Sequence, residues 1–275
     1  MRPDISGLYK LCDSPIGLIS IIYFRNISLP ISAKVCILVY MIVARAVHSI
    51  FLYLLAAATY ILGTTIAICF VPLAKKPTRP FQIAARWWAK LLLFFSGVRI
   101  TTNNLSAVPT DRPLIIAVNH QSMADIIILL ATVPVFFRFA IKKELFSIPV
   151  FGWYLRAAGY FPIDRASILS GYSVLKKMTK IMADGDSILI FPEGTRSRDG
   201  SLGAFRRASL LAAQKTGAPV LPVALSGSFD IVPRHTYFVK PTKVKVSFGH
   251  LVAFDDEEAY DKKVEEVRSF IAENL

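Results

Sequence analysis

The hydrophobic positions of this chain change pattern near Pro113. Before it, apolar residues predominate in the segment 31–74, and residues 46–74 contain His48 but no Asp, Glu, Lys or Arg. A helix needs about 20 such residues to cross a bilayer, so the segment predicts a helix that spans a membrane or a tight helical hairpin that dips into one. Pro77 and Pro80 follow it and predict a break in the helix.

A signal peptide and a buried core helix are the two alternatives to a membrane helix for this apolar segment. A cleaved signal peptide lies nearer the N-terminus, and its apolar core runs only about 7–15 residues. A buried core helix would also be apolar, but the domain that follows supplies apolar segments of its own. We therefore expect membrane association, and we assign no role to residues 1–30 or to the apolar run 16–24 within them.

From Pro113 onward, short apolar segments alternate with longer segments of helical character. Six strands are predicted, at residues 114–118, 136–141, 160–163, 187–191, 220–225 and 243–248. Four helices are predicted between them, at residues 123–131, 144–157, 168–183 and 205–215. Short strands separated by helices of about ten or more residues indicate a sheet covered on both faces. The predicted fold class is α/β, a mixed, largely parallel sheet flanked by helices, with an N-terminal membrane-associated helical segment.

The same pattern divides the chain into three parts. Residues 1–30 form an N-terminal segment, residues 31–84 a membrane-associated helical region with a basic connector, and residues 85–275 an α/β domain. The domain is expected to end in an amphipathic helix, because apolar residues recur at helical spacing after the four acids at 255–258, which suit a helix N-terminus.

Composition and charge support the membrane interpretation. The chain is 54% hydrophobic, with a mean hydropathy of +0.50, and its 32 Lys and Arg residues outnumber its 19 Asp and Glu residues. Within the first hundred residues the only acids are Asp4 and Asp13. Lys75, Lys76 and Arg79 directly follow the apolar segment, which by the positive-inside rule places that end in the cytoplasm.

The segment 86–95 combines aromatic and basic residues, with Trp87 and Trp88 between Arg86 and Lys90. Such a segment is typical of an interfacial anchor on anionic lipid. It fits equally well the first helix of the soluble domain, packed on the sheet. The sequence leaves both interpretations open.

Several other classes of function are poorly supported. A basic protein can bind nucleic acid, but the chain has no zinc-finger spacing, no RNA-binding aromatic signature and no dense basic run outside the membrane-flanking segments. The three cysteines are scattered and odd in number, which favours reduced thiols over a disulfide framework. No metal site is predicted, because the four histidines lack ligand spacing: His48, His120, His235 and His250.

His120 and Asp125 are the first candidates for chemistry. Five positions apart, they would lie about 140° apart around a regular helix, so they can meet only if His120 precedes the helix and Asp125 lies in its first turn. The imidazole would then lie at the C-terminal end of a strand, where open α/β sheets bind ligands. Asp125 would fix the tautomer and leave the other ring nitrogen free as a general base. A capping box from Ser122 to Asp125 accounts for the carboxylate equally well, but it leaves His120 without a role.

The second candidate is the loop Phe191-Pro192-Glu193-Gly194-Thr195-Arg196-Ser197, at the end of a predicted buried strand. Gly194 allows the backbone to approach a ligand closely. Four arginines lie within a dozen residues, namely Arg196, Arg198, Arg206 and Arg207. Guanidinium groups suit phosphate, so their density beside a glycine loop favours an anion-binding site. An ordinary Pro-Glu-Gly turn is the alternative.

A third cluster runs from Lys142 to Arg165 and contains the segments Lys142-Lys143-Glu144 and Ile163-Asp164-Arg165. Arg165 follows a predicted strand and could reach a phosphate. A surface arginine paired with Asp164 is equally consistent with the sequence.

In order and spacing, these motifs resemble those of the glycerophospholipid acyltransferases, most closely the 1-acyl-sn-glycerol-3-phosphate (lysophosphatidate) acyltransferases. The four matching segments are, in chain order, 119–125, 142–165, 191–197 and the Pro-containing apolar strand 219–223. The resemblance covers roughly residues 85–250, and four motifs in the same order make it specific.

The resemblance implies roles for individual residues. His120 would be the catalytic base, Asp125 would orient it, and Pro222 would help to shape the site. The substrate-binding residues that it implies are Lys142, Arg165, Glu193, Gly194, Thr195, Arg196 and Arg206. Two positions depart from the family pattern. Phe205-Arg206-Arg207-Ala208 stands where the family often has Phe-Lys-x-Gly, which bears on head-group recognition, and Pro162 interrupts a usually apolar run.

The implied reaction moves a fatty acyl group from a thioester, acyl-CoA or acyl-carrier protein, to the sn-2 hydroxyl of lysophosphatidate, giving phosphatidate. The chain has no Gly-x-Ser-x-Gly elbow and no Cys beside either motif, so direct transfer is expected. No cofactor is expected beyond the thioester co-substrate.

The implied partners are the phospholipid bilayer, a lysophospholipid acceptor and the thioester donor, without nucleic acid. The protein is expected to be integral to the membrane, with its active site facing the cytoplasm. Three alternatives remain: the same chemistry on another lyso-lipid, such as lyso-ornithine lipid, or on glycerol-3-phosphate; a hydrolase; and a non-catalytic membrane-binding module.

Overall fold

The computed structural model describes residues 30–163, 168–206, 208–232, 236–254 and 259–275. The N-terminal segment up to residue 29 and the candidate residue Arg165 lie outside these ranges. The chain forms two compact units, one up to Phe51 and one from Leu52 to Leu275. The sheet and all candidate site residues within the described ranges belong to the second unit.

α3 (Ile31–Phe70) is the long apolar helix that the first hydrophobic segment predicts, as one continuous helix rather than a hairpin. The stretch Val35–Leu73 has a mean hydropathy of 2.2 over its most apolar window, of which 11% is buried. By length and composition it can cross a membrane. Its low burial is unlike that of a soluble core helix, which indicates membrane association.

The predicted break after the apolar helix is confirmed. A short 3₁₀ turn, η1 (Val71–Leu73), leads into the connector, and α4 (Arg79–Ser96) begins with Pro80 in its first turn. A proline is tolerated there because first-turn N–H groups have no partner within the helix. α4 ends at Gly97, whose left-handed backbone (φ 71°) closes the helix.

α4 has two apolar faces. The first belongs to the core and includes Phe81, Ala85, Ala89 and Leu93. The second is open to the surroundings, and its Trp87 and Phe94 are 69% and 78% exposed. Packing of the aromatic segment on the core is therefore confirmed, and its role as an interfacial anchor stays a prediction that the exposed face is consistent with. The compact unit begins at Leu52, ahead of residue 85, because Ala67 of α3 and Phe81 of α4 already contribute to the core.

Over the described residues, seven strands form one sheet: β1 (Arg99–Asn103), β2 (Ile115–Val118), β3 (Phe137–Lys142), β4 (Phe161–Ile163), β5 (Ser187–Ile190), β6 (Val220–Ser226) and β7 (Lys243–Phe248). Their order is β1-β7-β6-β2-β5-β3-β4, and every neighbouring pair is parallel except β6 and β7. The predicted mixed, largely parallel sheet is confirmed. β1 was not expected, because this exposed edge strand is largely polar in sequence.

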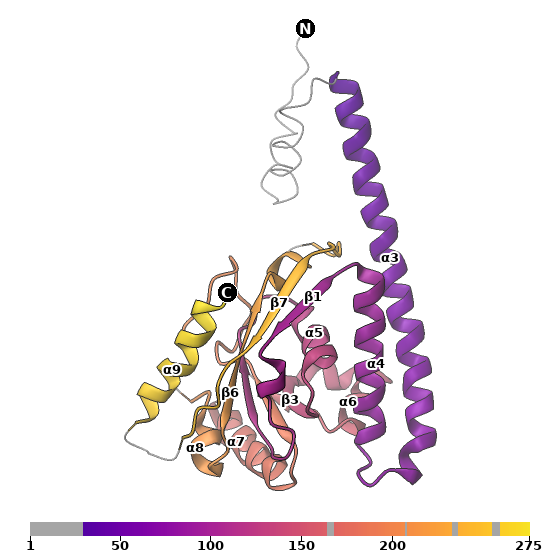
Figure 1. Ribbon diagram of the computed structural model, residues 1–275. Coiled ribbons are helices and arrows are strands. Elements are labelled where there is room, and N and C mark those ends of the chain that lie inside the picture. The colour runs from indigo at the N-terminus through magenta and orange to yellow at the C-terminus, as the bar shows by residue number, and fades with distance from the viewer. Residues whose placement is uncertain (1–29, 164–167, 207, 233–235, 255–258) are drawn as a thin grey trace. The chain divides into compact units, whose positions relative to one another are not determined.

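Helices cover both faces of the sheet (Figure 1). α5 (Asp125–Thr132) and α6 (Phe151–Ala157) lie with α4 on one face, and α7 (Ile168–Ala183), α8 (Leu211–Thr216) and α9 (Tyr260–Glu273) lie on the other. Successive residues of β2 alternate between the two apolar clusters, with Ile116 in one and Ile115 in the other. Short 3₁₀ turns complete the described elements: η2 (Leu105–Ala107), η3 (Lys143–Ser147) and η4 (Ser228–Asp230).

Two predicted helices differ from expectation. The segment 144–157 is divided into η3 and α6, because Pro149 between them has no N–H with which to continue a helix. Of the helix predicted at 205–215, only α8 forms. The Arg206 N–H donates to the Pro192 carbonyl (2.9 Å) and so holds the chain before α8 in a loop.

A buried carboxylate links the α3–α4 connector to the sheet. Asp186, whose side chain is 1% exposed, precedes β5 and pairs with Lys76 (3.0 Å), Arg79 (2.7 Å) and Arg138 of β3. Burial raises the pKa of this carboxyl, but hydrogen bonds and charge from the three cations outweigh burial and hold the pKa below its usual value. Asp186 therefore joins three segments that are distant in sequence.

Asp186→Asn is expected to lower the free energy of unfolding by about 2 kcal/mol at neutral pH. The loss is smaller than the loss of a fully buried ion pair, because two of the cations that pair with Asp186 are partly exposed. Since the pKa of Asp186 is lower in the folded chain, its contribution is complete above the unfolded pKa of about 3.9 and is lost as the pH falls further. The thermal midpoint in detergent, followed from about pH 7 down to pH 3, should show the gap between the two proteins narrowing in acid. The exposed neighbour Asp184→Asn is the control, and a gap that stays constant into acid would contradict the assignment.

Candidate active site

His120 and Asp125 meet where β2 ends and α5 begins. His120 lies in the loop after Val118, and Asp125 is the first residue of α5. His120 Nδ1 and Asp125 Oδ2 are 2.7 Å apart. Because an ionised carboxylate can only accept, Nδ1 carries the proton and Nε2 keeps its lone pair. The geometry predicted from the spacing of the two residues is confirmed.

The same carboxylate oxygen also organises the loop. Asp125 Oδ2 accepts hydrogen bonds from the backbone N–H groups of Gln121 (2.7 Å) and Ser122 (2.8 Å). Ser122 Oγ in turn accepts from the Ala124 N–H (3.3 Å). The predicted Ser122–Asp125 capping box forms only in part. Asp125 accepts the Ser122 N–H, but the N-cap of α5 is Ala124, which has no side-chain cap hydrogen bond, and Ser122 Oγ does not accept from Asp125. The fully buried carboxylate therefore organises the loop and orients the histidine at once.

Glu193 holds the His120 loop from the other side. Its Oε1 accepts the His120 backbone N–H (2.8 Å), and its Oε2 accepts the Gly203 N–H (2.7 Å). The residue is 7% exposed, so both oxygens are occupied by backbone donors in a buried position. The family resemblance implies that Glu193 binds substrate, whereas these contacts are those of a residue that positions His120.

Two further contacts join the histidine loop to the Gly-Thr-Arg loop. The Ser197 N–H donates to the His120 carbonyl (2.7 Å), and Gln121 Nε2 donates to the Gly200 carbonyl (2.6 Å). Together with Glu193, they make the two sequence motifs one assembly.

Asn119 attaches that assembly to the sheet. Its side-chain amide donates to the Leu225 carbonyl (2.9 Å) and accepts from the Leu225 N–H (2.7 Å), so both amide groups are paired with the backbone of β6. The residue is fully buried, where an unpaired amide would be costly. β2 and β6 therefore fix the start of the loop that carries His120.

Phe191 supports the imidazole from its face. The two rings are stacked, with centroids 3.9 Å apart and an interplanar angle of 15°. The His120 side chain is 14% exposed, and it opens into a cavity of about 440 Å³. Asp125 at its edge and Phe191 on its face hold the ring in one orientation toward this cavity.

The cavity combines a few charged groups with an apolar lining. Lys142 and Arg196 line it together with His120. The remaining lining is largely apolar or aromatic. Helices α3, α4, α5 and α6 supply much of it, for example Tyr60, Trp88, Ile127, Phe151 and Tyr154, and β3 contributes as well. Cavities of about 300–1,000 Å³ with a small number of polar groups are typical of organic ligand sites.

Gly194 and Arg206 line a second cavity, of about 500 Å³, on the sheet face that α7 and α8 cover. Gly194 has a left-handed backbone (φ 72°), and a Cβ there would collide with the Arg206 guanidinium, so glycine is required. The implied substrate-binding residues are thus divided between two cavities, with Phe191 lining both.

The remaining implied residues contribute less to the described site. Thr195 is exposed on its loop, and Arg165 lies outside the described residues. Pro222 lies in β6 opposite Ala117, and it lines neither cavity.

Sequence reasoning did not assign roles to Asn119, Gln121 or Phe191. A signal was present, because Asn119 and Gln121 flank His120 directly after an apolar strand, and polar residues buried there must find partners. Phe191 opens the matched segment 191–197, but the motif by itself does not predict that its ring stacks on the imidazole.

Comparisons with known proteins show which family the chain resembles. Residues 99–226 match the family described as Acyltransferase. Over 181 residues the chain is 30% identical to a 1-acyl-sn-glycerol-3-phosphate acyltransferase of Borreliella burgdorferi, an alignment that covers 66% of this chain and 72% of the relative. The chain belongs to the acyltransferase family.

This acyltransferase also resembles a longer plant protein and a solved structure. It is 34% identical over 174 residues to a chloroplastic 1-acyl-sn-glycerol-3-phosphate acyltransferase of Arabidopsis thaliana. That alignment covers 63% of this chain and 48% of the relative. The chain thus spans about half the length of that plant relative. The crystal structure of the 1-acyl-sn-glycerophosphate acyltransferase from Thermotoga maritima matches with a TM-score of 0.72 and 26% identity, over 84% of this chain and 96% of that one.

Glu193→Gln leaves one acceptor oxygen and sets an amide NH₂ against a backbone N–H of this acyltransferase. We expect kcat to fall about tenfold to a hundredfold, because His120 loses its fixed position, while KM for the acyl acceptor changes little. The measurement is thiol release from an acyl thioester at varied acceptor concentration.

Glu265→Gln is the matched control, because this exposed carboxylate on α9 pairs only locally with Arg268 (3.0 Å). It should leave both kinetic parameters unchanged. A raised KM at unchanged kcat in Glu193→Gln would instead identify Glu193 as a substrate ligand.

Proposed function

We propose that this acyltransferase transfers a fatty acyl group from a thioester, acyl-CoA or acyl-carrier protein, to the sn-2 hydroxyl of lysophosphatidate, giving phosphatidate. The observation that carries the proposal is one cavity that combines a base oriented by Asp125, two cations and an apolar lining. The relatives from Borreliella burgdorferi and Arabidopsis thaliana are named for this activity.

His120 would act as the general base. Its Nε2 takes the proton of the acceptor hydroxyl as the oxygen attacks the thioester carbonyl carbon. The tetrahedral intermediate then collapses, the C–S bond breaks, and the thiolate leaves with the proton returned by His120. A positioned general base contributes about 10² to 10⁴ in rate. Asp125 stabilises the imidazolium formed between the two proton transfers.

The charge that develops on the carbonyl oxygen needs donors. The backbone N–H groups of Gln121 and Ser122 are already used by Asp125, so these two do not serve as an oxyanion hole. Lys142 and Arg196 line the cavity with His120 and are exposed enough to adapt to a ligand. We assign these two cations to the acceptor phosphate and the developing oxyanion together.

The bilayer would supply the acceptor. α3 can cross a membrane, and the exposed face of α4 carries Trp87 and Phe94. Lys75, Lys76 and Arg79 follow the apolar helix, which favours an integral protein whose active site faces the cytoplasm. The apolar lining of the cavity would receive an acyl chain without exposing it to water.

His120→Ala should lower turnover of acyl-CoA or acyl-carrier protein with lysophosphatidate by at least about a hundredfold. The assay is thiol release by the detergent-purified protein, with the thermal midpoint measured to show that the variant is folded. His250→Ala is the matched control, because His250 is exposed and lines neither cavity. Near-normal turnover by folded His120→Ala would overturn the assignment of the base.

An acceptor panel separates the reaction from the substrate. Thiol release that requires lysophosphatidate supports the proposal as stated. Release only with lyso-ornithine lipid, another lyso-lipid or glycerol-3-phosphate would overturn the acceptor but keep the reaction. Release with no acceptor present would identify a hydrolase, and no release with any acceptor would favour a membrane-binding module.

A further inference from the structure

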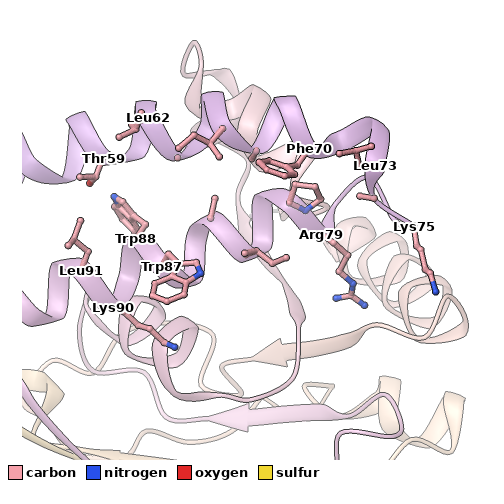
Figure 2. A pocket seen from close by; sticks show the side chains of 17 residues that line it. Thr59, Leu62, Phe70, Leu73, Lys75, Arg79, Trp87, Trp88, Lys90 and Leu91 are labelled. Atoms are coloured by element: carbon pink, nitrogen blue, oxygen red, sulfur yellow. The ribbon is translucent and has the colours of Figure 1, made fainter.

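Besides the two cavities described above, an apolar depression lies between α3 and α4, and we call it the α3–α4 slot (Figure 2). It has a volume of about 930 Å³. Its apolar lining includes Leu62, Ile66 and Phe70 of α3 and Ile83, Trp87 and Leu91 of α4. These six side chains do not belong to the cavity of His120, although both are lined by Ala84 and Trp88.

The slot is long rather than round. Its α3 wall runs from Thr59 to Phe70, and eleven residue steps along a helix span about 17 Å. The hydrocarbon core of a bilayer is about 30 Å thick, so one leaflet accounts for about 15 Å of it. The slot therefore has the length of an acyl chain in one leaflet.

The two ends of the slot differ in charge. Lys75 and Arg79 lie at one end, and Trp87, Lys90 and Leu91 lie toward the other (Figure 2). The Lys90 ammonium is 5.3 Å from the centre of the Trp87 ring, and the Arg79 guanidinium is 4.4 Å from the centre of the Phe136 ring, so both ends have a cation with an aromatic partner. Among the lining residues, two cations lie at the first end and one lies toward the second.

The end at Arg79 carries an excess of positive charge. Lys76, Arg79 and Arg138 all pair with the single carboxylate of Asp186. Lys75 is exposed beside them. A second acid, the exposed Asp184, is nearby, because its backbone carbonyl accepts from Lys76 (2.6 Å). Four cations against these two acids leave this end of an apolar slot suited to an anion.

A ligand that fits a cationic end and a long apolar slot has an anionic head group and a long apolar chain, which is the chemistry of an amphiphile. We propose that the α3–α4 slot binds one anionic glycerophospholipid of the bilayer as a ligand that is not the substrate. Its phosphate lies against Lys75 and Arg79, and one acyl chain runs along the slot toward Leu91. The proposal rests on the membrane association proposed above and is independent of the acyl-transfer chemistry, because it uses neither His120 nor Arg196.

The bound lipid has a structural consequence. It would fill the space between two helices that contact each other at one edge, where Trp88 Nε1 donates to the Ala56 carbonyl (3.0 Å). Because Trp88 and Ala84 also line the His120 cavity, the lipid would stabilise one wall of that cavity. We therefore expect the thermal midpoint to rise as the slot fills.

The test measures lipid binding directly. The full chain is delipidated in detergent and titrated with dioleoyl-phosphatidylglycerol or dioleoyl-phosphatidylcholine, and bound lipid is counted by native mass spectrometry with the thermal midpoint followed in parallel. We expect one phosphatidylglycerol to bind per chain. We expect it to bind at least about fivefold more tightly than phosphatidylcholine, because a single surface cation contributes about that factor.

Two pairs of variants locate the lipid. Lys75→Glu should weaken phosphatidylglycerol binding about 30-fold, since a charge reversal counts as two cations at about 1 kcal/mol each. Lys90→Glu makes the same change in net charge at the other end and should have little effect. Ile83→Glu places a charge in the slot and should abolish tight binding. Ile148→Glu is its control, because both isoleucines are 46% exposed and Ile148 lies outside the slot.

Each outcome either supports or overturns the proposed lipid site. Equal binding of the two lipids, equal effects of Lys75→Glu and Lys90→Glu, or an unaffected Ile83→Glu would each overturn the proposal and indicate only general attraction to a charged surface. Since bound lipid is counted without turnover, an inactive enzyme that still binds one phosphatidylglycerol would contradict the proposed reaction but not the lipid site.

Discussion

A buried carboxylate can accept hydrogen bonds but cannot donate them, and this constraint determines the active site. Asp125 and Glu193 are both buried, where a carboxylate oxygen needs N–H donors. Both oxygens of Glu193 and the Oδ2 of Asp125 have such donors, whereas the Oδ1 of Asp125 has no partner among the described residues. Asp125 finds them in the His120 ring and in the two residues that follow it, and Glu193 finds them in the His120 backbone and in Gly203. His120 is therefore held by its ring from one side and by its main chain from the other.

The sequence predicted the parts of the fold that depend on local patterns. The six expected strands formed. The apolar runs of β2, β5 and β6 are buried on both faces, whereas β7 begins with alternating exposed and buried residues. α7 matches residues 168–183. The meeting of His120 and Asp125 also followed from spacing, since their separation requires a strand-to-helix turn. Three features were not predicted. The loop at Pro149 depends on the missing N–H of the proline, and the loop before α8 depends on a long-range hydrogen bond. The edge strand β1 depends on its pairing with β7.

The site was less predictable than the fold, because which side of a loop faces a ligand is a tertiary property. Glu193 and Arg196 stand three residues apart, yet one is buried against the backbone and the other lines the His120 cavity. Gly194, between them, turns toward Arg206 and the opposite face of the sheet. α3 and α4 likewise serve two roles. They carry the exposed apolar surface, and they also line the His120 cavity, α3 through Tyr60 and Thr64 and α4 through Trp88. The proposed membrane association and the proposed chemistry therefore involve the same two helices.

The central claim is that both carboxylates act through His120. Thiol release from the acyl thioester should be compared in His120→Ala and in the double variants that add Asp125→Asn or Glu193→Gln to it. If the carboxylates only position His120, each double variant will retain the residual rate of His120→Ala, because nothing is left to position. A further loss of about tenfold or more in either double variant would contradict the claim, since that carboxylate would then act on the substrate independently of His120.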